Sequence, residues 1–241
     1  MRFESPLIAG TLLQRYKRFL ADVRLADGSI ITAHTPNTGS MLGCAEPGSR
    51  VWLRWVDNPT RKYPYAWELV ESHAGAMVGI NTGVVNRLVS EAIDAGVVAE
   101  LQGYASVRQE VRYGSENSRI DLLLEGGGRP ACYVEIKNVT AVDSDGTAFF
   151  PDAVSARGSK HLRELMQVVA QGGRGVIFFC VQRNDAQAVR PADEIDPLYG
   201  RTLREVMAAG VEAVAYRARV TAQAIMLDTA LPVHIGQVTT A

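Results

Sequence analysis

The sequence contains few cysteines and no long apolar run. Its 241 residues include three cysteines, which lie far apart, and an odd number without close pairs argues against a disulfide framework and a zinc site. The longest apolar run, residues 176–181, is far shorter than the roughly 20 residues of a membrane-spanning helix. The first residues also lack the apolar segment of a signal peptide. We therefore expect a cytoplasmic protein without a membrane partner.

The sequence also lacks a strong net charge. Its 25 Lys and Arg residues nearly balance its 26 Asp and Glu residues, and the formal net charge is −1. A surface that binds nucleic acid must therefore be a local basic patch rather than a property of the whole chain. No glycine-rich phosphate loop follows a candidate strand, and the four histidines do not have the spacing of metal ligands. The length suits two modest domains.

Residues 1–80 contain short strand-like segments and no helical periodicity. The candidate strands cover residues 7–13, 19–25, 29–34, 51–56 and 66–70. Turn signals such as Asp27-Gly28 separate them. A series of this kind predicts a small closed barrel, and the five-stranded oligonucleotide/oligosaccharide-binding (OB) barrel fits the size.

Basic and aromatic residues are interleaved in this segment. The basic residues are Arg15, Lys17, Arg18, Arg61 and Lys62, and the aromatic residues are Tyr16, Trp55, Tyr63, Tyr65 and Trp67. Basic groups beside aromatic faces suit a nucleic-acid groove. The alternative is that the tryptophans belong to the core and the charges are solvated. Under the first interpretation, Arg15, Lys17 and Arg18 contact DNA.

From residue 81 the pattern changes to an alternation of helices and strands. We expect helices from a cap at residue 81 or 82 to Gly96, and over 159–170 and 202–209. We expect strands over 105–113, 120–124, 131–136, 175–182 and 212–218. This order predicts an α/β domain with a central mixed sheet over residues 81–236, followed by a tail at 237–241.

A predicted hairpin at residues 118–138 carries the most informative side chains. Asp121 lies on its first strand, and Glu135 and Lys137 lie at the end of its second strand. Residues two apart on a strand share a face, and carboxylates in apolar strands are costly unless paired or bound to metal. We predict that Asp121, Glu135 and the Ile136 carbonyl hold Mg²⁺ or Mn²⁺, and that Lys137 orients or deprotonates the attacking water.

A second group of candidates lies at the start of the helix predicted over 159–170. A helix N-terminus with added cations favours anions, so we predict that Arg157, Lys160 and His161 contact DNA phosphate. The alternative is that Lys160 is solvated and His161 caps or packs against the helix. Three further residues are accessory candidates, namely Glu91, Glu110 and Gln182. For Glu91 a solvated helix face is the alternative.

Several motifs occur in order along the chain. They are Asn-Thr-Gly-Ser-Met at 37–41, Ser-Arg-Ile-Asp at 118–121, Val-Glu-Ile-Lys-Asn-Val-Thr at 134–140 and Phe-Pro-Asp-Ala-Val-Ser-Ala-Arg-Gly-Ser-Lys-His-Leu at 150–162. Together they resemble the sugar fermentation stimulation protein family. The resemblance implies an OB barrel, a C-terminal domain similar to the PD-(D/E)XK (restriction-endonuclease-like) nucleases, DNA binding and a regulatory role in sugar metabolism. Ile120 stands where the nuclease label has proline.

Two functions follow from these observations. The first is a magnesium-dependent (endo)deoxyribonuclease, because carboxylates that face phosphate repel DNA unless a cation intervenes. The second is a regulator of sugar-metabolism genes that keeps the nuclease fold for DNA binding only. A sugar-binding barrel would rest on fold analogy alone. The sequence leaves the oligomeric state open, and a homodimer is compatible with it.

Overall fold

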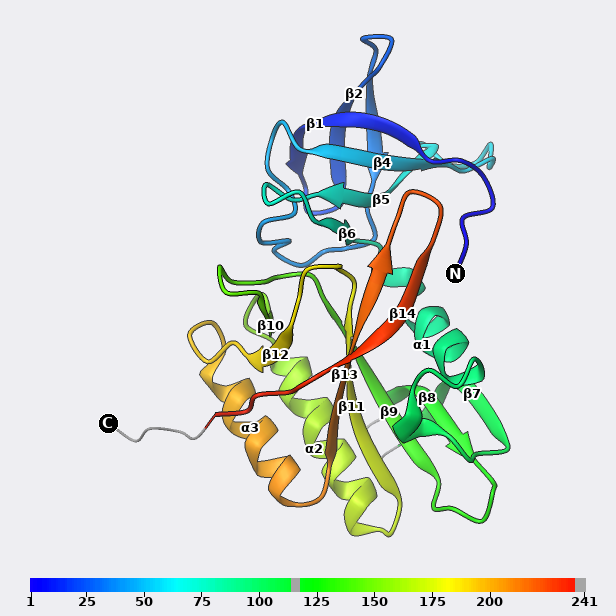
Figure 1. Ribbon diagram of the computed structural model, residues 1–241, viewed down its shortest axis with the longest axis vertical. Helices are drawn as coiled ribbons and strands as arrows, with labels where there is room; N and C mark the ends of the chain where they lie inside the picture. The colour runs from blue at the N-terminus through cyan, green and yellow to red at the C-terminus, as the bar shows by residue number, and fades with distance from the viewer. Residues whose placement is uncertain (114–117, 237–241) are drawn as a thin grey trace.

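The chain forms an N-terminal barrel and a C-terminal sheet with helices on both faces (Figure 1). The computed structural model describes residues 1–113 and 118–236, so the predicted tail at 237–241 lies outside the described residues. Within those residues, the helices are too short or too polar to span a membrane.

Six strands make up the N-terminal part. They are β1 (Ile8–Tyr16), β2 (Leu20–Leu25), β3 (Ile30–His34), β4 (Arg50–Trp55), β5 (Tyr65–Glu71) and β6 (Met77–Gly79). Their order is β3-β2-β1-β4-β5-β6, and β3 also pairs in parallel with β5. This extra pairing closes five strands into a ring, which confirms the predicted OB-like barrel. The sixth strand, β6, was not predicted, because a three-residue strand is too short to show alternation.

Alternation along the strands fills the barrel with apolar side chains. Leu12, Val23, Leu53 and Trp67 are fully buried in one cluster. The indole nitrogen of Trp67 donates a hydrogen bond to the Leu69 carbonyl over 2.9 Å. Trp67 is therefore a core residue, as the alternative interpretation of the aromatic residues proposed.

The C-terminal part is a six-stranded mixed sheet. Its strands are β7 (Ser106–Tyr113), β8 (Ser118–Glu125), β9 (Cys132–Val139), β11 (Arg174–Val181), β13 (Glu212–Val220) and β14 (Ile225–Leu231). The order is β14-β13-β11-β9-β8-β7. The three central strands are parallel, and β7, β8 and β14 are antiparallel to their neighbours. The predicted α/β domain with a mixed sheet is confirmed.

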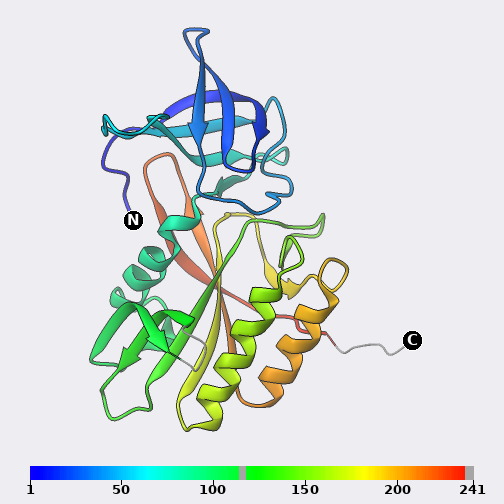
Figure 2. The same ribbon diagram turned by 180° about the vertical axis from the view of Figure 1, so that it is seen from behind.

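Helices cover the two faces of this sheet. On one face, α1 (Val85–Asp94) buries Leu88 and Val89 against β8, β9 and β14. On the other face, α2 (Ala156–Ala170) and α3 (Pro197–Ala208) lie side by side (Figure 2). The buried β11 contributes to both apolar clusters, with Phe178 toward α1 and Phe179 toward α2 and α3. This explains why its sequence is almost wholly apolar.

Two helices begin earlier than the sequence pattern indicates. Helix α2 starts at Ala156 because Ser155 caps it, accepting a hydrogen bond from the Gly158 amide over 3.0 Å. Helix α3 starts at Pro197, and Asp196 caps it in the same way. The prediction followed apolar spacing alone and passed over these caps, although both residue types are favoured there. As a result, Arg157 lies inside α2, in its first turn.

In the C-terminal part, three strands were missed by the prediction. Strand β14 alternates between buried and exposed residues, so its period-two pattern was present but was not used. The other two, β10 (Thr147–Phe150) and β12 (Ala188–Pro191), form a separate parallel pair. Each of these has four residues, and their pairing connects segments that are distant in sequence. Local pattern does not indicate such a contact.

A polar latch joins the barrel to the C-terminal part. The hydroxyl of Ser40 donates to the Asp152 carboxylate over 2.8 Å, and the Met41 amide donates to the same oxygen over 3.2 Å. A Cβ added at Gly39 would lie 2.8 Å from that carboxylate, so a larger residue there would displace Asp152 from this contact. Arg15 then fixes this loop by donating to the carbonyls of Asn37, Gly39 and Ser40.

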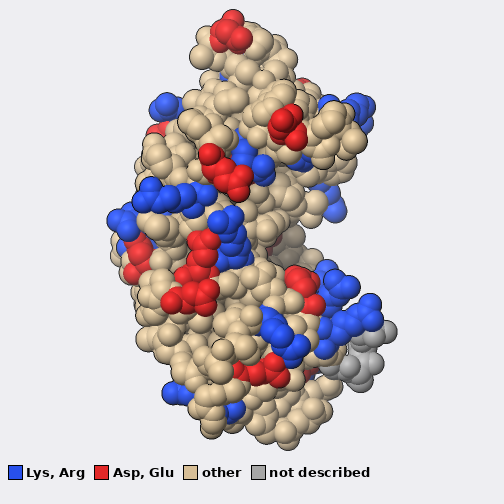
Figure 3. All heavy atoms as spheres, turned by 90° about the vertical axis from the view of Figure 1, so that its right-hand side faces the viewer, with Lys and Arg blue, Asp and Glu red and all other residues tan. Residues whose placement is uncertain are grey.

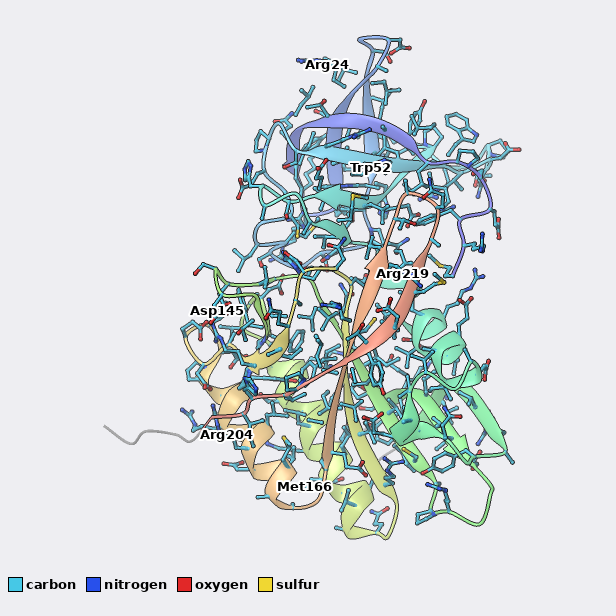
Figure 4. The ribbon with its side chains drawn as sticks, viewed as in Figure 1. Arg24, Trp52, Asp145, Met166, Arg204 and Arg219 are labelled. Atoms are coloured by element: carbon cyan, nitrogen blue, oxygen red, sulfur yellow. The ribbon has the colours of Figure 1, made fainter. Side chains whose placement is uncertain are left out.

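Apolar contact reinforces the latch. Trp52 and Leu69 of the barrel belong to the same buried cluster as Val220 and Ile225 of the β13–β14 hairpin. Figure 4 labels Trp52 on the barrel, with Arg219 on the hairpin below it. The two parts therefore share a continuous interface of apolar and polar contacts, and the barrel has a defined position relative to the sheet.

Candidate active site

The candidate site lies where β8 and β9 separate. The two strands are paired from Leu122–Val134 to Leu124–Cys132, and their pairing stops on the far side of Leu122. At that point the Asp121 carboxylate takes the place of a backbone acceptor. It accepts a hydrogen bond from the Ile136 amide over 2.7 Å. The amide and carbonyl of one strand residue point to the same side, so the Ile136 carbonyl also faces the gap.

Glu135 is almost fully buried beside this gap. Its Oε1 accepts a hydrogen bond from Lys137 Nζ over 2.8 Å and contacts His161 Nδ1 on α2. Its Oε2 is buried and has no hydrogen-bond partner among the described residues. One oxygen of Glu135 is therefore held by two donors, and the other is available to a ligand.

The proton on His161 can be placed from its neighbours. Arg157 Nε donates to His161 Nε2 over 3.2 Å, and an arginine has no acceptor. His161 Nε2 is therefore the acceptor, and Nδ1 carries the proton that it donates to Glu135. The first two turns of α2 thus fix the orientation of Glu135.

The two carboxylates differ in their preference for the charged state. Burial and the charge of Glu135 raise the pKa of Asp121 to about 6. Burial alone would also raise the pKa of Glu135, but the hydrogen bond from His161 and the charge of Lys137 outweigh it and lower that pKa. Around neutral pH both carboxylates in the gap are therefore negatively charged, and the surroundings of Asp121 disfavour its charge.

Glu110 adds a third carboxylate to the gap. It lies opposite Asp121 on β7, between the paired residues Gln109–Leu122 and Val111–Ile120. Its φ of 55° is in the left-handed region, which residues other than glycine rarely adopt and which recurs at functional sites. Asn86 on α1 joins the two acids, donating to Glu110 over 3.0 Å and to Asp121 over 3.4 Å.

These residues surround a pocket of about 510 Å³. It is lined by Glu110, Ser118, Arg119, Asp121, Glu135, Arg157, Lys160 and His161. Acidic groups from the sheet therefore face basic groups from α2 and β8. The structure brings together Asp121, Glu135 and Lys137 with the predicted residues of α2 and with Glu110.

Other predicted site residues lie elsewhere. Glu91 pairs with the amino terminus over 2.6 Å and with Arg87. Gln182 donates to Asn138 and to the Asn81 carbonyl, next to the barrel. Arg15 donates to four carbonyls of the barrel's own loops. Lys17 and Arg18 are exposed in the β1–β2 turn, where both have positive φ.

Sequence reasoning missed a group of residues behind the pocket. Glu164 on α2 is buried and accepts from Ser118 over 2.7 Å, while its second oxygen has no partner among the described residues. Burial and the charges of Glu135, Glu164 and Asp121 raise the pKa of Tyr113. Glu164 lies three residues after His161, on the same face of a helix, and this spacing was the available signal.

The raised pKa of Asp121 has a consequence for stability. Below a pH of about 4 the group is neutral whether the chain is folded or unfolded. Between about 4 and 6 the folded protein keeps the proton that the unfolded chain has lost, so stability falls as pH rises through this window. Above about pH 6 the folded protein has also lost the proton, and the total decrease in the free energy of unfolding is at most about 3 kcal/mol.

We therefore expect Asp121→Asn to stabilise the protein at pH 7.5 without divalent cations, by about 1–2 kcal/mol. The amide oxygen can still accept from the Ile136 amide but carries no charge. Thermal unfolding in EDTA at pH 7.5 and pH 4.5 would measure the effect, which should shrink at the lower pH. Asp57→Asn, in an exposed loop, is the control. If the Asp121→Asn variant is no more stable than wild type at pH 7.5, the charge of Asp121 does not destabilise the folded protein.

Sequence comparisons assign this chain to a family. A profile described as the SfsA N-terminal OB domain matches residues 13–80. A second profile, described as the sugar fermentation stimulation protein RE domain, matches residues 83–224. The chain belongs to the sugar fermentation stimulation protein family.

Curated members of this family align with nearly the whole chain. A sugar fermentation stimulation protein homolog from Geobacter sulfurreducens is 63% identical over 237 residues, covering 98% of this chain and 100% of that protein. A homolog from Thioalkalivibrio sulfidiphilus is 60% identical over 237 residues, with 98% and 99% coverage. One from Shewanella baltica is 52% identical over 235 residues, with 98% and 100% coverage.

A solved structure of the family has the same fold. SfsA from Pyrococcus furiosus, in complex with Ca²⁺, matches with a TM-score of 0.85 at 28% identity, over 97% of this chain and 98% of that one. Together with the two profiles, it confirms the predicted fold class of an OB-like barrel followed by a restriction-endonuclease-like domain.

Proposed function

We propose that this protein is a divalent-cation-dependent deoxyribonuclease whose active site is the gap between β8 and β9. The observation that carries the proposal is the state of Glu135. One of its oxygens is fixed by Lys137 and His161, while the other is buried without a partner among the described residues, beside Asp121 and the Ile136 carbonyl. An unpaired buried carboxylate oxygen is unfavourable unless a cation or proton neutralises it.

The donors in the gap fit a hard cation such as Mg²⁺ or Mn²⁺. Carboxylate and carbonyl oxygens are the ligands that these ions prefer, and Mg²⁺ keeps several waters when proteins bind it. Among the described residues, no three His, Cys, Asp or Glu side chains are already arranged as a metal site. Two carboxylates, one carbonyl and water would therefore hold the ion. The Ca²⁺ complex of the Pyrococcus furiosus relative supports divalent-cation binding at this fold.

A cation bound there would polarise a phosphodiester oxygen and make a water more acidic. Hydrolysis adds that water across one P–O bond, leaving a phosphate on one product and a hydroxyl on the other. Lys137 would donate to the attacking water or to the charge that develops on phosphorus. His161 would keep Glu135 oriented throughout, because its own position is fixed by Arg157.

The surroundings of the pocket suit a DNA backbone. Arg119, Arg157 and Lys160 line it, and the last two lie in the first turns of α2, where the helix dipole also favours anions. Figure 3 shows the molecule hollowed between its upper and lower parts, with Lys and Arg side chains on both sides of the hollow. The cations that line the pocket would offset the repulsion between a phosphate chain and the acidic gap.

The test is cleavage by the purified protein. Circular single-stranded DNA, supercoiled plasmid and linear duplex should be incubated with Mg²⁺, Mn²⁺ or EDTA. We expect cleavage of at least one substrate with Mg²⁺ or Mn²⁺ and none in EDTA. Binding of all three DNAs without cleavage under any condition would favour the alternative function, a regulator of sugar-metabolism genes that retains the nuclease fold for DNA binding.

A further inference from the structure

The polar latch between the two parts of the protein lies a short distance along the chain from the helix that orients Glu135. Asp152 accepts from the Ser40 hydroxyl and the Met41 amide over 2.8 and 3.2 Å, and α2 has its N-cap at Ser155. Three residues span at most about 11 Å even when fully extended. A displacement of Asp152 is therefore passed on to the start of α2.

Polar contacts rather than packing hold the segment between the latch and the helix. Ala153 is exposed, and Val154 is 77% exposed. At the far end of the segment, the Ser155 amide donates to one oxygen of Asp196 over 2.9 Å, and the other oxygen of Asp196 caps α3. The segment is thus held at both ends, by the barrel at Asp152 and by the start of α3 at Ser155.

The barrel's side of the latch is a loop with its own internal contacts. Arg15 donates to the carbonyls of Asn37 and Gly39 over 3.1 and 2.8 Å, and the Asn37 side chain accepts from the Gly39 amide over 2.9 Å. Burial lowers the pKa of Arg15, and the charge of Asp152 opposes that shift. Asp152 therefore meets donors whose positions are set by the barrel, with a cation close behind them.

The first two turns of α2 connect the latch to the candidate active site. Arg157 follows the cap by two residues and donates to Nε2 of His161 over 3.2 Å. Nδ1 of His161 contacts the first oxygen of Glu135, whose second oxygen is buried without a partner among the described residues. Each step from the barrel to the gap is therefore a hydrogen bond, three residues of chain or the start of one helix.

We propose that Asp152 is a positioning residue, held by the barrel through Ser40, which sets the start of α2 and thereby the contact of His161 with Glu135. The barrel then completes the active site of the other part and does not serve only as a separate module. This inference rests on the proposed function, because it concerns the orientation of a ligand of the proposed cation.

The contact between His161 and Glu135 can be followed without metal or DNA. Nuclear magnetic resonance of the chain labelled with ¹⁵N-histidine, in EDTA, would report the ring nitrogens, and His161→Gln would identify the signals of His161. We expect a protonated Nδ1 and an unprotonated Nε2 in wild type. Asp152→Ala should shift or broaden this pair and leave the signals of the exposed His73 unchanged.

Cation affinity gives a second measurement that needs no DNA. Electron paramagnetic resonance would determine free Mn²⁺ during a titration of the protein. Residues that directly orient a metal ligand contribute about 10- to 100-fold to metal affinity. Because Asp152 acts one step further away, we expect Asp152→Ala to weaken Mn²⁺ binding by about 3- to 30-fold. Ser40→Ala should have a smaller effect, because the hydrogen bond from the Met41 amide remains.

Two further variants of the same loop are matched controls. Ser40→Thr keeps the hydroxyl and should retain the His161 signals and the Mn²⁺ affinity of wild type. Thr38→Ala removes an exposed hydroxyl that has no hydrogen bond within the described part of the chain, and it should leave both measurements unchanged. Ser40 is also exposed, so these changes test the latch without removing core volume.

The inference is overturned if Asp152→Ala has the His161 signals and the Mn²⁺ affinity of wild type. It is also overturned if the affinity falls while the His161 signals stay unchanged, because Asp152 would then act by another route. Mn²⁺ binding that depends on Asp152, without cleavage of any DNA, would remove the nuclease and leave the positioning role intact. Cleavage by Asp152→Ala at the wild-type rate would do the reverse.

Discussion

Replacing Lys137 with alanine is expected to reduce cation-dependent DNA cleavage by about 100- to 1,000-fold, the usual effect of removing one donor from a charge-stabilising site. Its ammonium group is held against Glu135 over 2.8 Å, and the side chain is 12% exposed. The change removes a positioned donor but little core volume. DNA affinity should stay within a few-fold, because a multi-contact interface loses at most one phosphate contact. Initial rates at saturating DNA would measure the effect.

Stability has to be measured on the same variant. Removing Lys137 leaves the Glu135 carboxylate with His161 as its remaining donor. The free energy of unfolding is therefore expected to fall by about 1–3 kcal/mol. Lys137→Met, which retains the apolar stem, is the matched variant and should be equally inactive. Cleavage at the wild-type rate would refute the assignment of Lys137. A loss of activity that only follows the unfolded fraction would make Lys137 a structural ion-pair partner.

The second large effect is expected in the barrel. Trp67→Ala should lower the free energy of unfolding by about 3–5 kcal/mol, the range for large aromatic residues deleted from a core. Trp67 is fully buried, and its indole nitrogen donates a hydrogen bond to the Leu69 carbonyl. The loss also leaves that carbonyl without its partner. Urea unfolding followed by far-UV circular dichroism would measure it.

Trp55→Ala is the matched change at an exposed position. It should shift the free energy of unfolding by no more than about 0.5 kcal/mol, because half of its side chain already faces solvent. An equal loss for both variants would mean that Trp55 supports the barrel.

Local pattern was sufficient for most of the fold. Alternation and turn residues identified the five strands of the barrel ring, and helical spacing identified α1 and the body of α2. It failed where a short element depends on a distant partner, as for β10 and β12. It also failed where a cap rather than apolar spacing sets the boundary, as at Ser155. In both cases the deciding interaction is outside the apolar pattern.

The candidate site shows the same division. The spacing of Asp121, Glu135 and Lys137 along one hairpin was readable from the sequence. The contact of His161 with Glu135 joins residues 26 positions apart, and Asn86 reaches Asp121 from another helix, so neither follows from local spacing. Arg15 is the opposite case. A basic residue beside aromatic ones suggested DNA, whereas the structure uses its guanidinium to hold a loop.

The latch between Ser40 and Asp152 sets a fixed distance between the two parts of the protein. It fixes the barrel at one distance from the gap between β8 and β9. A DNA strand that contacted both parts would therefore present the same phosphate to the gap in every binding event. On a tailed duplex, cleavage would then give products of one predominant length, set by the span of the molecule. Breaking the latch with Asp152→Ala would spread those products into a ladder.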